Sequence, residues 1–261
     1  MINISIITIN FNNSKGLEQT IQSVERQKNV EFEYVVIDGA STDGSVDVIK
    51  RHQEIISYWV SEKDGGIYEA MNKGVMASHG KYCLFLNSGD ELVESNTLSK
   101  VIPYLNNSID YVVGHELMTV KGISRYLWHS PHKCDVEYLI KYSLRHQASF
   151  IKRNMLITVP FDEQLRLVSD WKQMLVSFLS FEATYMSIPV VVDKCERIGA
   201  TYNNKRQSLC ERQSVLNQLF PHDNIIVTNP TDKFGGRFMM RVLHLWGFIE
   251  AKLFNLKITF L

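Results

Sequence analysis

Short runs of β-branched and apolar residues alternate with amphipathic segments over the first 114 residues of the chain. Helical spacing of apolar residues fills the intervals between the runs, and this alternation is typical of a parallel sheet covered by helices. The runs expected to form strands are residues 4–9, 33–38, 56–61, 82–86 and 110–114. The segments expected to form helices are residues 14–27, 45–54, 67–78 and 94–105.

The alternation weakens after residue 114 into shorter strands and turns, with a helix expected near 170–181 and a strand near 183–193. No internal repeat and no low-complexity linker separates the two regions. We therefore expect one α/β domain over residues 1–230, with 1–114 and 115–230 as its regular and less regular halves.

Residues 231–261 form a separate, amphipathic C-terminal segment in this interpretation. Apolar residues from Met239 to Leu253 share one side of the expected helix, and basic residues from Arg237 to Lys252 share the other. This pattern is typical of a helix lying in a membrane interface. It suits a helix that packs on the domain or on a second subunit equally well, so a peripheral membrane contact and a homodimer both stay open.

Overall charge and cysteine content exclude several classes of function. Lys plus Arg equals Asp plus Glu at 28 each among 261 residues, so no nucleic-acid partner is expected. The four cysteines form no CxxC pair, which indicates reduced thiols and neither a zinc motif nor a disulfide framework. The N-terminal sequence lacks the features of a signal peptide, and no apolar stretch reaches the roughly 18 residues of a membrane span. A cytoplasmic protein is the expectation.

Polar side chains follow four successive expected strands. Asn10, Asp38 and Asp64 come after the first three, and Asn87 and Asp90 come after the fourth. Any one of these loops is explained by ordinary turn and cap chemistry. Together they would lie at the carboxyl edge of the sheet, where open α/β sheets bind ligands, and their carboxylates would repel one another unless a divalent cation or a ribose lay between them.

Two phosphate-binding motifs are missing. The sequence has no GxGxxG after the first strand and no GxxxxGK[ST]. An edge rich in acids would hold a diphosphate through a bridging cation with oxygen ligands, Mg²⁺ or Mn²⁺.

The stretches SIITINFNNSKGLEQTIQSV, VIDGASTDGS, SEKDGGIYEAMNKG and LFLNSGDEL, in that order, resemble the nucleotide-sugar half of family 2 glycosyltransferases of the GT-A fold. The resemblance covers roughly the first 115 residues. RHQASFIKRN and FDEQLRLVSDWKQML resemble the acceptor half of bacterial members that build surface polysaccharides, including the colanic acid type. The series of motifs is far more specific than any one of them.

The resemblance implies a role for each residue at the expected edge. Asn87 stands where the family commonly has a metal-loop carboxylate, so it is expected to bind ribose, and Asp90 is left as the single direct ligand of Mn²⁺ or Mg²⁺. The other donor-binding residues implied are Thr8 and Asn10 against the nucleotide, Asp38 on the base or ribose, Asp64 closing the pocket and Lys73 balancing charge.

Inverting sugar transfer needs a base that takes the proton of the acceptor hydroxyl. Asp170 is the expected catalytic base by resemblance, although a helix N-terminus would lower its pKa. His146 is the alternative base and is expected, with Gln147, to position substrate. Arg153 is expected to meet a diphosphate or an anionic acceptor.

The resulting hypothesis is an inverting glycosyltransferase that moves a sugar, by resemblance from a UDP-sugar, to a saccharide or a lipid-linked saccharide at the inner face of the membrane. A sugar nucleotidyltransferase is one alternative, although the loop after the first strand lacks the expected glycines and basic residues. A catalytically silent nucleotide-sugar-binding subunit is the other, and the depleted metal loop is its best argument.

Overall fold

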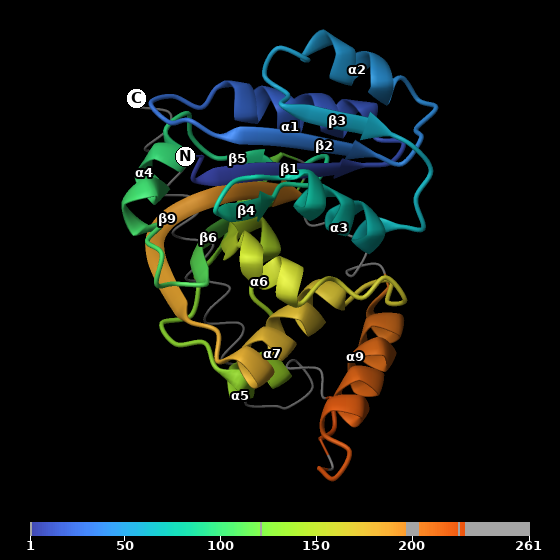
Figure 1. The fold of residues 1–261 in the computed structure, drawn as a ribbon, viewed down its shortest axis with the longest axis vertical. Coiled ribbons are helices and arrows are strands. Elements are labelled where there is room, and N and C mark those ends of the chain that lie inside the picture. The colour runs from blue at the N-terminus through green and yellow to red at the C-terminus, as the bar shows by residue number, and fades with distance from the viewer. Residues whose placement is uncertain (1, 121, 197–203, 224, 228–261) are drawn as a thin grey trace.

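The computed structural model describes residues 2–120, 122–196, 204–223 and 225–227. Within them, nine strands form one curved sheet with helices on both faces (Figure 1). The spatial order is β3-β2-β1-β4-β8-β6-β9-β5, and β7 pairs with β6 outside this path. The strands are β1 (Ile4–Asn10), β2 (Glu33–Asp38), β3 (Tyr58–Ser61), β4 (Tyr82–Phe85), β5 (Glu91–Leu92), β6 (Tyr111–Val120), β7 (Ile123–Trp128), β8 (Ser149–Lys152) and β9 (Tyr185–Glu196).

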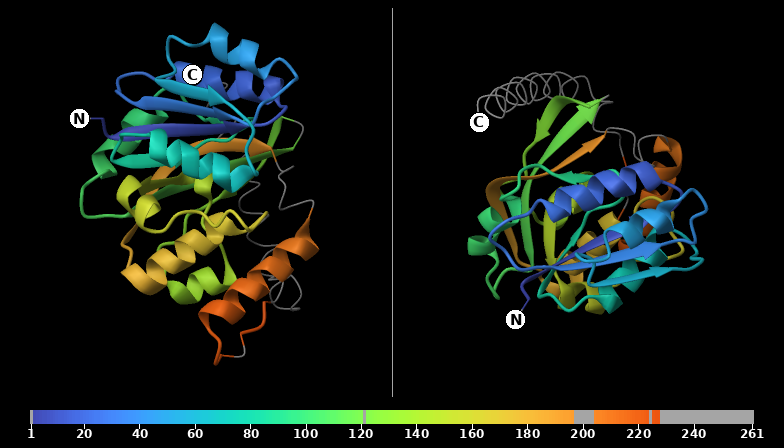
Figure 2. Two further views of the ribbon diagram at one scale, coloured as in Figure 1. Left: turned by 45° about the vertical axis from the view of Figure 1, so that its right-hand side comes forward. Right: turned by 90° about the horizontal axis from the view of Figure 1, so that it is seen from above.

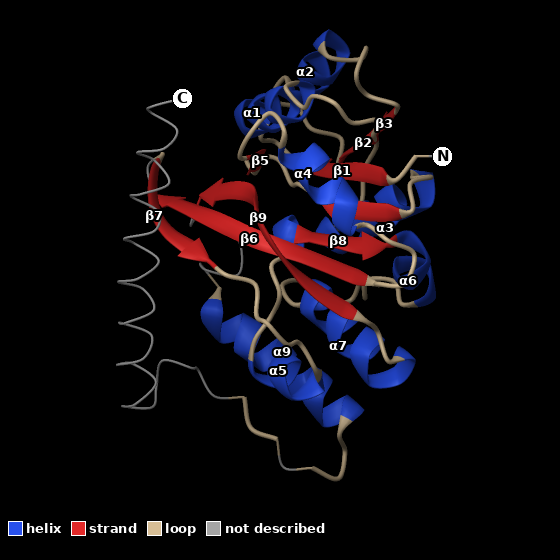
Figure 3. Ribbon diagram, turned by 90° about the vertical axis from the view of Figure 1, so that its left-hand side faces the viewer, coloured by secondary structure: helices blue, strands red, loops and turns tan. Residues whose placement is uncertain are grey.

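The helices divide between the two faces of the sheet (Figure 3). α1, α2 and α4 pack on one face, and α3, α5, α6 and α7 pack on the other. The helices are α1 (Ser14–Glu25), α2 (Ser45–Arg51), α3 (Ile67–Ala77), α4 (Thr97–Val101), α5 (Val136–Lys141), α6 (Arg153–Thr158), α7 (Ser169–Phe181) and α9 (Lys205–Leu219), with short 3₁₀ turns η1 (Ile102–Tyr104) and η2 (His146–Ala148).

Strand alternation explains the two layers of the core. Ile4 and Ile6 of β1 are buried with the residues of α1, whereas Ile7 and Ile9 are buried with those of α3. Side chains of one strand point alternately to opposite faces, so a strand covered on both sides is apolar throughout. Burial of apolar surface stabilises the fold by about 25 cal/mol per Å², which drives the layers together.

The first four strands are parallel and place their carboxyl ends on one edge. β1 pairs with β2 so that Asn10 lies opposite Asp38, and β2 pairs with β3 so that Asp38 lies opposite Ser61. β1 and β4 are also parallel. The predicted α/β class and the parallel order of this half are confirmed.

The second half is woven into the same sheet. β8 lies antiparallel between β4 and β6, β6 runs parallel to β9, and β5 pairs antiparallel with β9. The sheet is therefore mixed beyond β4, where the sequence predicted a mostly parallel one. The expected boundary at residue 114 falls inside β6, because this strand extends to Val120.

Two further expectations differ from the structure in extent. The helix expected over 94–105 ends at Val101, because Pro103 has no amide hydrogen and forces a 3₁₀ turn. The strand expected over 56–61 begins at Tyr58. β5, β7, β8, α5, α6 and α9 were not predicted individually, since each is short or weakly periodic.

Helix α9 lies beyond α5 and α7, at the end of the molecule remote from α2 (Figures 1 and 2). Its Val215 and Leu216 join the core on that face. None of the helices within the described residues is long and apolar enough to cross a membrane. The expected amphipathic segment 231–261 lies outside the described residues.

Candidate active site

The loops that follow β1 and β4 are tied together at the carboxyl edge of the sheet. The Asn13 side chain caps α1 by accepting from the Gly16 amide and donates to the Ser88 carbonyl oxygen at 3.0 Å. The Thr20 hydroxyl of α1 donates to the Asp90 carbonyl oxygen at 2.7 Å. The start of α1 thus holds the loop of residues 87–90 in place, as an N-cap residue with a second partner can.

Asp38 lies at the predicted edge, but its carboxylate is occupied by the protein. It accepts from Asn10 Nδ2 at 2.7 Å, from the amide and hydroxyl of Ser41 at 2.9 and 2.6 Å, and from Ser61 Oγ at 2.6 Å. Burial alone would raise the pKa of Asp38, yet these bonds hold it below the ordinary value. A carboxylate offers about four acceptor sites, so Asp38 fixes the turn after β2 and the expected direct contact with base or ribose is not available in this arrangement.

Thr8 also departs from its expected role. Its side chain is fully buried, and its hydroxyl donates to the Leu86 carbonyl oxygen at 2.7 Å and lies 3.0 Å from Tyr34 Oη. Thr8 therefore links β1 to the end of β4 instead of lying against a nucleotide. Asn10, by contrast, has a buried Oδ1 that meets no hydrogen-bond donor among the described residues.

Asp64 lies over the turn that Asp38 holds. A Cβ built on Gly39 would approach Asp64 Oδ2 to 2.9 Å, and Asp64 accepts from the Gly66 amide at 3.0 Å. Burial raises the pKa of Asp64, and the charge of Asp38 acts in the same direction. The structure thus brings Asp38 and Asp64 together, as expected.

Lys73 does not face these carboxylates directly. Its Nζ lies 2.9 Å from Glu62 and 3.0 Å from Glu69, one helical turn earlier on α3. The charge of Lys73 also reaches Asp64 and acts to lower the pKa of that carboxyl.

A chain of polar contacts joins the loop after β4 to helix α7. His146 of η2 has Nε2 at 3.3 Å from Asn87 Nδ2 and Nδ1 at 3.1 Å from Asp170 Oδ2. Tyr68 of α3 donates to Asp170 Oδ1 at 3.2 Å. In the neutral tautomer that fits these contacts, Asn87 donates to His146 and His146 donates to Asp170. Three segments far apart in sequence meet at Asp170.

Asp170 and His146 shift each other's pKa in opposite directions. Burial would raise the pKa of Asp170, but the hydrogen bond and charge of His146 lower it below the ordinary value. Burial would lower the pKa of His146, but Asp170 raises it. The Asp170 side chain keeps 19% exposure, so it can be reached from solvent. The expected catalytic residue and the expected positioning residue are direct partners.

Asp90 lies close enough to His146 for their charges to interact. Burial raises the pKa of Asp90 to about 7, while the charge of His146 and a hydrogen bond from the Gln147 side chain act to lower it. Asn87 in the same loop has a buried Oδ1 with no hydrogen-bond donor among the described residues. His146 and Gln147 of η2 thus face the loop predicted to bind metal.

Arg153 lies at the opposite edge of the sheet, which excludes its expected role in this arrangement. It follows β8, whose Lys152 pairs with Tyr82 at the start of β4, and its amide donates to the Lys81 carbonyl oxygen. Its Nε donates to the Val75 carbonyl oxygen at 3.1 Å. Arg153 closes the end of α3 and is remote from the carboxyl ends of the strands.

Four residues near this edge were missed by sequence reasoning. Glu116 of β6 and Asp193 of β9 are buried carboxylates, Cys195 is a buried thiol, and Arg145 lies 3.4 Å from Glu116. The available signal was weak: single polar residues interrupt the apolar runs VVGHEL and PVVVDKC. A charge inside a strand interior is rarely buried without a partner, so such interruptions identify candidates.

Comparison with known proteins places this geometry in a family. Residues 5–162 match the family model described as Glycosyl transferase family 2. The chain belongs to glycosyl transferase family 2. It is therefore a glycosyltransferase, which removes the sugar nucleotidyltransferase as a class. Over 207 residues it is 29% identical to the PGL/p-HBAD biosynthesis glycosyltransferase of Mycobacterium bovis, covering 76% of this chain and 78% of that protein.

The fold of this chain is similar to that of solved glycosyltransferase structures. TarS 1-349 of S. aureus in complex with UDP-GlcNAc has a TM-score of 0.66 at 17% identity, over 96% of this chain and 81% of that one. The mannosyltransferase PcManGT from Pyrobaculum calidifontis in complex with GDP-Man and Mn²⁺ has a TM-score of 0.64 at 15% identity, over 96% and 73%. At these identities the likeness establishes the GT-A fold.

Proposed function

We propose that this glycosyltransferase transfers a sugar, with inversion at the anomeric carbon, from a nucleoside diphosphate sugar to a hydroxyl of a saccharide or lipid-linked saccharide. The observation that carries the proposal is the chain Asn87, His146, Asp170, which joins the loop after β4 to a solvent-reachable carboxylate on α7. Inversion needs a leaving group on one side of the sugar and a base on the other.

Asp170 is the proposed base. The acceptor oxygen forms a bond to the anomeric carbon, the bond from that carbon to the diphosphate oxygen breaks, and the acceptor proton moves to Asp170. The nucleoside diphosphate leaves with the electron pair. Tyr68 and His146 fix both carboxylate oxygens of Asp170, so the base is oriented before substrate arrives. His146 is proposed as a positioning residue, with Gln147 beside it.

The donor is proposed to lie between the edge formed by Asn10 and Asp64 and the loop of Asn87 and Asp90. The buried Oδ1 atoms of Asn10 and Asn87 have no donor among the described residues and suit ribose hydroxyls. The carboxylate of Asp90 suits a divalent cation, Mn²⁺ or Mg²⁺, which it would bind directly. When bound, the cation would neutralise charge on the departing diphosphate.

The acceptor and the biological setting are inferred from relatives. Besides the PGL/p-HBAD protein, a Bacillus subtilis relative at 25% identity over 147 residues has a name that refers to teichuronic acid biosynthesis. Both names support the proposal that the acceptor belongs to the bacterial cell surface. We place the transfer in the cytoplasm, where nucleotide sugars are found. A peripheral membrane contact and a homodimer through residues 231–261 belong to the same proposal.

The test is a thermal-shift panel of UDP-, GDP-, dTDP- and CDP-sugars with and without Mn²⁺, followed by transfer assays with the sugar that stabilises the chain. A ligand at 100 times its Kd raises stability by about 2.7 kcal/mol, so one nucleotide class should stand out. Donor binding together with transfer supports the proposal. Donor binding without donor hydrolysis or transfer to any saccharide would favour the silent subunit.

A further inference from the structure

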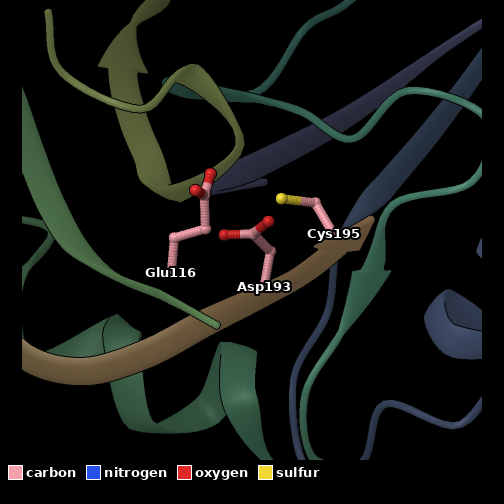
Figure 4. A group of neighbouring side chains, drawn as sticks. All are labelled: Glu116, Asp193 and Cys195. Carbon is pink, nitrogen blue, oxygen red and sulfur yellow. The ribbon is translucent and has the colours of Figure 1, made fainter. Parts of the chain in front are cut away.

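Glu116, Asp193 and Cys195 converge at one point between strands β6 and β9 (Figure 4). Glu116 on β6 pairs in register with Asp193 on the neighbouring parallel strand β9, and Cys195 follows two residues later on the same side of that strand. One ligand atom from each of the three residues lies within 4.8 Å of the others. Their relative exposures are 1%, 0% and 7%.

The two carboxylates are buried without hydrogen-bond donors. All four oxygens of Glu116 and Asp193 lack a donor among the described residues. The other fully buried carboxylate in the sheet, Asp38, accepts four hydrogen bonds. Leaving a buried carboxylate unsatisfied costs several kcal/mol or more, so the oxygens of Glu116 and Asp193 call for a positive ligand.

The positive charge beside this cluster comes from Arg145, whose single guanidinium faces Glu116, Asp193 and Cys195 together. Arg145 Nε lies 3.4 Å from Glu116 Oε1, and Arg145 also stacks over Trp128. Asp90 adds a third acid close enough to influence Asp193, and His146 of the neighbouring turn is engaged by Asp170.

We propose that Glu116, Asp193 and Cys195 bind a divalent transition-metal ion of the zinc type. Ions with ligand bonds of about 2.0–2.3 Å bring their ligand atoms to roughly 3–4 Å from one another, which the observed cluster allows. A thiol among the ligands favours Zn²⁺ or Co²⁺ over Mg²⁺ and Ca²⁺. This site is distinct from the cation proposed at Asp90 and does not rest on the proposed transfer reaction.

The metal would join β6 to β9 and place positive charge close to Asp90. Sequence spacing alone gives no hint of it, because Glu116 and Asp193 are brought together only by the pairing of the two strands. Its simplest rival is a proton shared by the two carboxyl groups, which would need no ion.

The test uses the full chain carrying Cys210→Ser, which removes the exposed thiol, stripped with chelator and free of nucleotide. Co²⁺ is the probe, because a Co²⁺–thiolate bond gives a charge-transfer absorption band. We expect about one Co²⁺ per chain with this band, displaced by Zn²⁺. Cys195→Ser should abolish the band, and Cys134→Ser, which alters another buried cysteine outside the cluster, should keep it.

Glu116→Gln and Asp193→Asn separate the metal from the shared proton. Both substitutions keep side-chain size and remove repulsion, and circular dichroism confirms that the variants fold. We expect Co²⁺ affinity to fall on the order of 10- to 100-fold or more in each. Failure of the parent chain to bind Co²⁺ with a thiolate band would overturn the proposal. So would a Co²⁺ affinity of Glu116→Gln and Asp193→Asn equal to that of the parent chain.

Discussion

Asp170, the proposed base, is held in place on both sides although its pKa is lowered. Its pKa is lowered by His146, but both of its oxygens are held by side chains from other elements. Because proton transfer depends first on geometry and then on pKa, a fixed carboxylate with solvent access is a better base than its pKa alone indicates.

The Asp170→Asn variant should therefore lose transfer and keep donor binding. We expect the rate of transfer to fall about 10²- to 10⁴-fold, since the amide cannot take the acceptor proton. The dissociation constant of the nucleotide sugar, measured by titration calorimetry, should change by no more than about three-fold, because Asp170 is not a proposed donor ligand. Steady-state transfer assays on the same preparations give the rate.

Asp162→Asn is the matched control for this variant. Asp162 precedes helix α7 and pairs at 2.6 Å with Lys172, which lies on α7 together with Asp170. Asp162 is not part of the chain of contacts from Asn87 to Asp170. Transfer by Asp162→Asn should stay near that of the parent chain. A transfer rate in Asp170→Asn that equals that of the control would remove Asp170 as the base.

Sequence reasoning found the residues that follow strands and missed those that lie inside them. Asn87 was named from loop polarity together with the family resemblance, Asp170 from the resemblance, and His146 from its motif and the chemistry of histidine. Glu116 and Asp193 escaped because their meeting depends on the parallel pairing of β6 with β9. Thr8 and Arg153 were misplaced because a motif gives position along the chain, whereas hydrogen-bond partners are decided by neighbours in space.

At the level of elements, Gly74 sets how closely α3 approaches the sheet. A Cβ built on Gly74 would lie 2.4 Å from Ile7 Cγ2, and Ile7 is fully buried in β1. The Gly74→Ala variant gains about 1 kcal/mol of helix propensity but overpacks the core at a cost of about 1–3 kcal/mol. With so short a contact we expect a net loss of about 1–2 kcal/mol in urea unfolding.

Met76→Ala on the same helix provides the comparison, since Met76 is 68% exposed. Its free energy of unfolding should lie within about 0.5 kcal/mol of the parent value. If Gly74→Ala were as stable as Met76→Ala, the close packing of α3 on β1 would not be the constraint described above.

The amino edge of the sheet is held by a buried acid, Glu33 of β2. Its carboxylate accepts from Ser5 Oγ at 2.5 Å, from the His79 amide at 2.6 Å and from His79 Nδ1 at 2.8 Å. Burial would raise the pKa of Glu33, but these hydrogen bonds lower it from its ordinary value of 4.5. The acid thus connects β2 to β1 and to the turn before β4.

Glu33→Gln should destabilise the protein by about 1–3 kcal/mol at pH 7, because a charged acceptor becomes a neutral amide. A lowered pKa contributes stability that is present above 4.5 and is lost as pH falls through the folded-state pKa. The difference in unfolding free energy between parent and variant should therefore shrink below pH 4.5. Urea titrations between pH 3 and 7 measure this difference, with Glu31→Gln at an exposed position as the control. If the difference between the parent chain and Glu33→Gln did not depend on pH, the role given to the Glu33 carboxylate would be wrong.

For the molecule as a whole, the order of strands binds the two expected halves into one unit. The sequence placed the boundary at residue 114 because helical alternation stops there. The structure continues β6 past that point and inserts β8 between β4 and β6. Alternation along the chain could predict the four parallel strands, because a helix lies between each strand and the next, but could not predict pairings that join residue 91 to residue 194.

This topology predicts that residues 1–114 do not fold alone. The fragment would lack β8 and β9, leaving β4 and β5 with unpaired edges and the stub of β6 without neighbours. It would also uncover Phe85 and Met71, which are buried on the face that α7 covers through Trp171. Exposed strand edges and apolar faces of this kind favour aggregation over folding.

We expect the fragment to show no cooperative urea transition by far-ultraviolet circular dichroism, while the full chain unfolds with coincident dichroism and tryptophan fluorescence transitions. A cooperative transition in the soluble fragment would show that the nucleotide-sugar half is a domain in its own right.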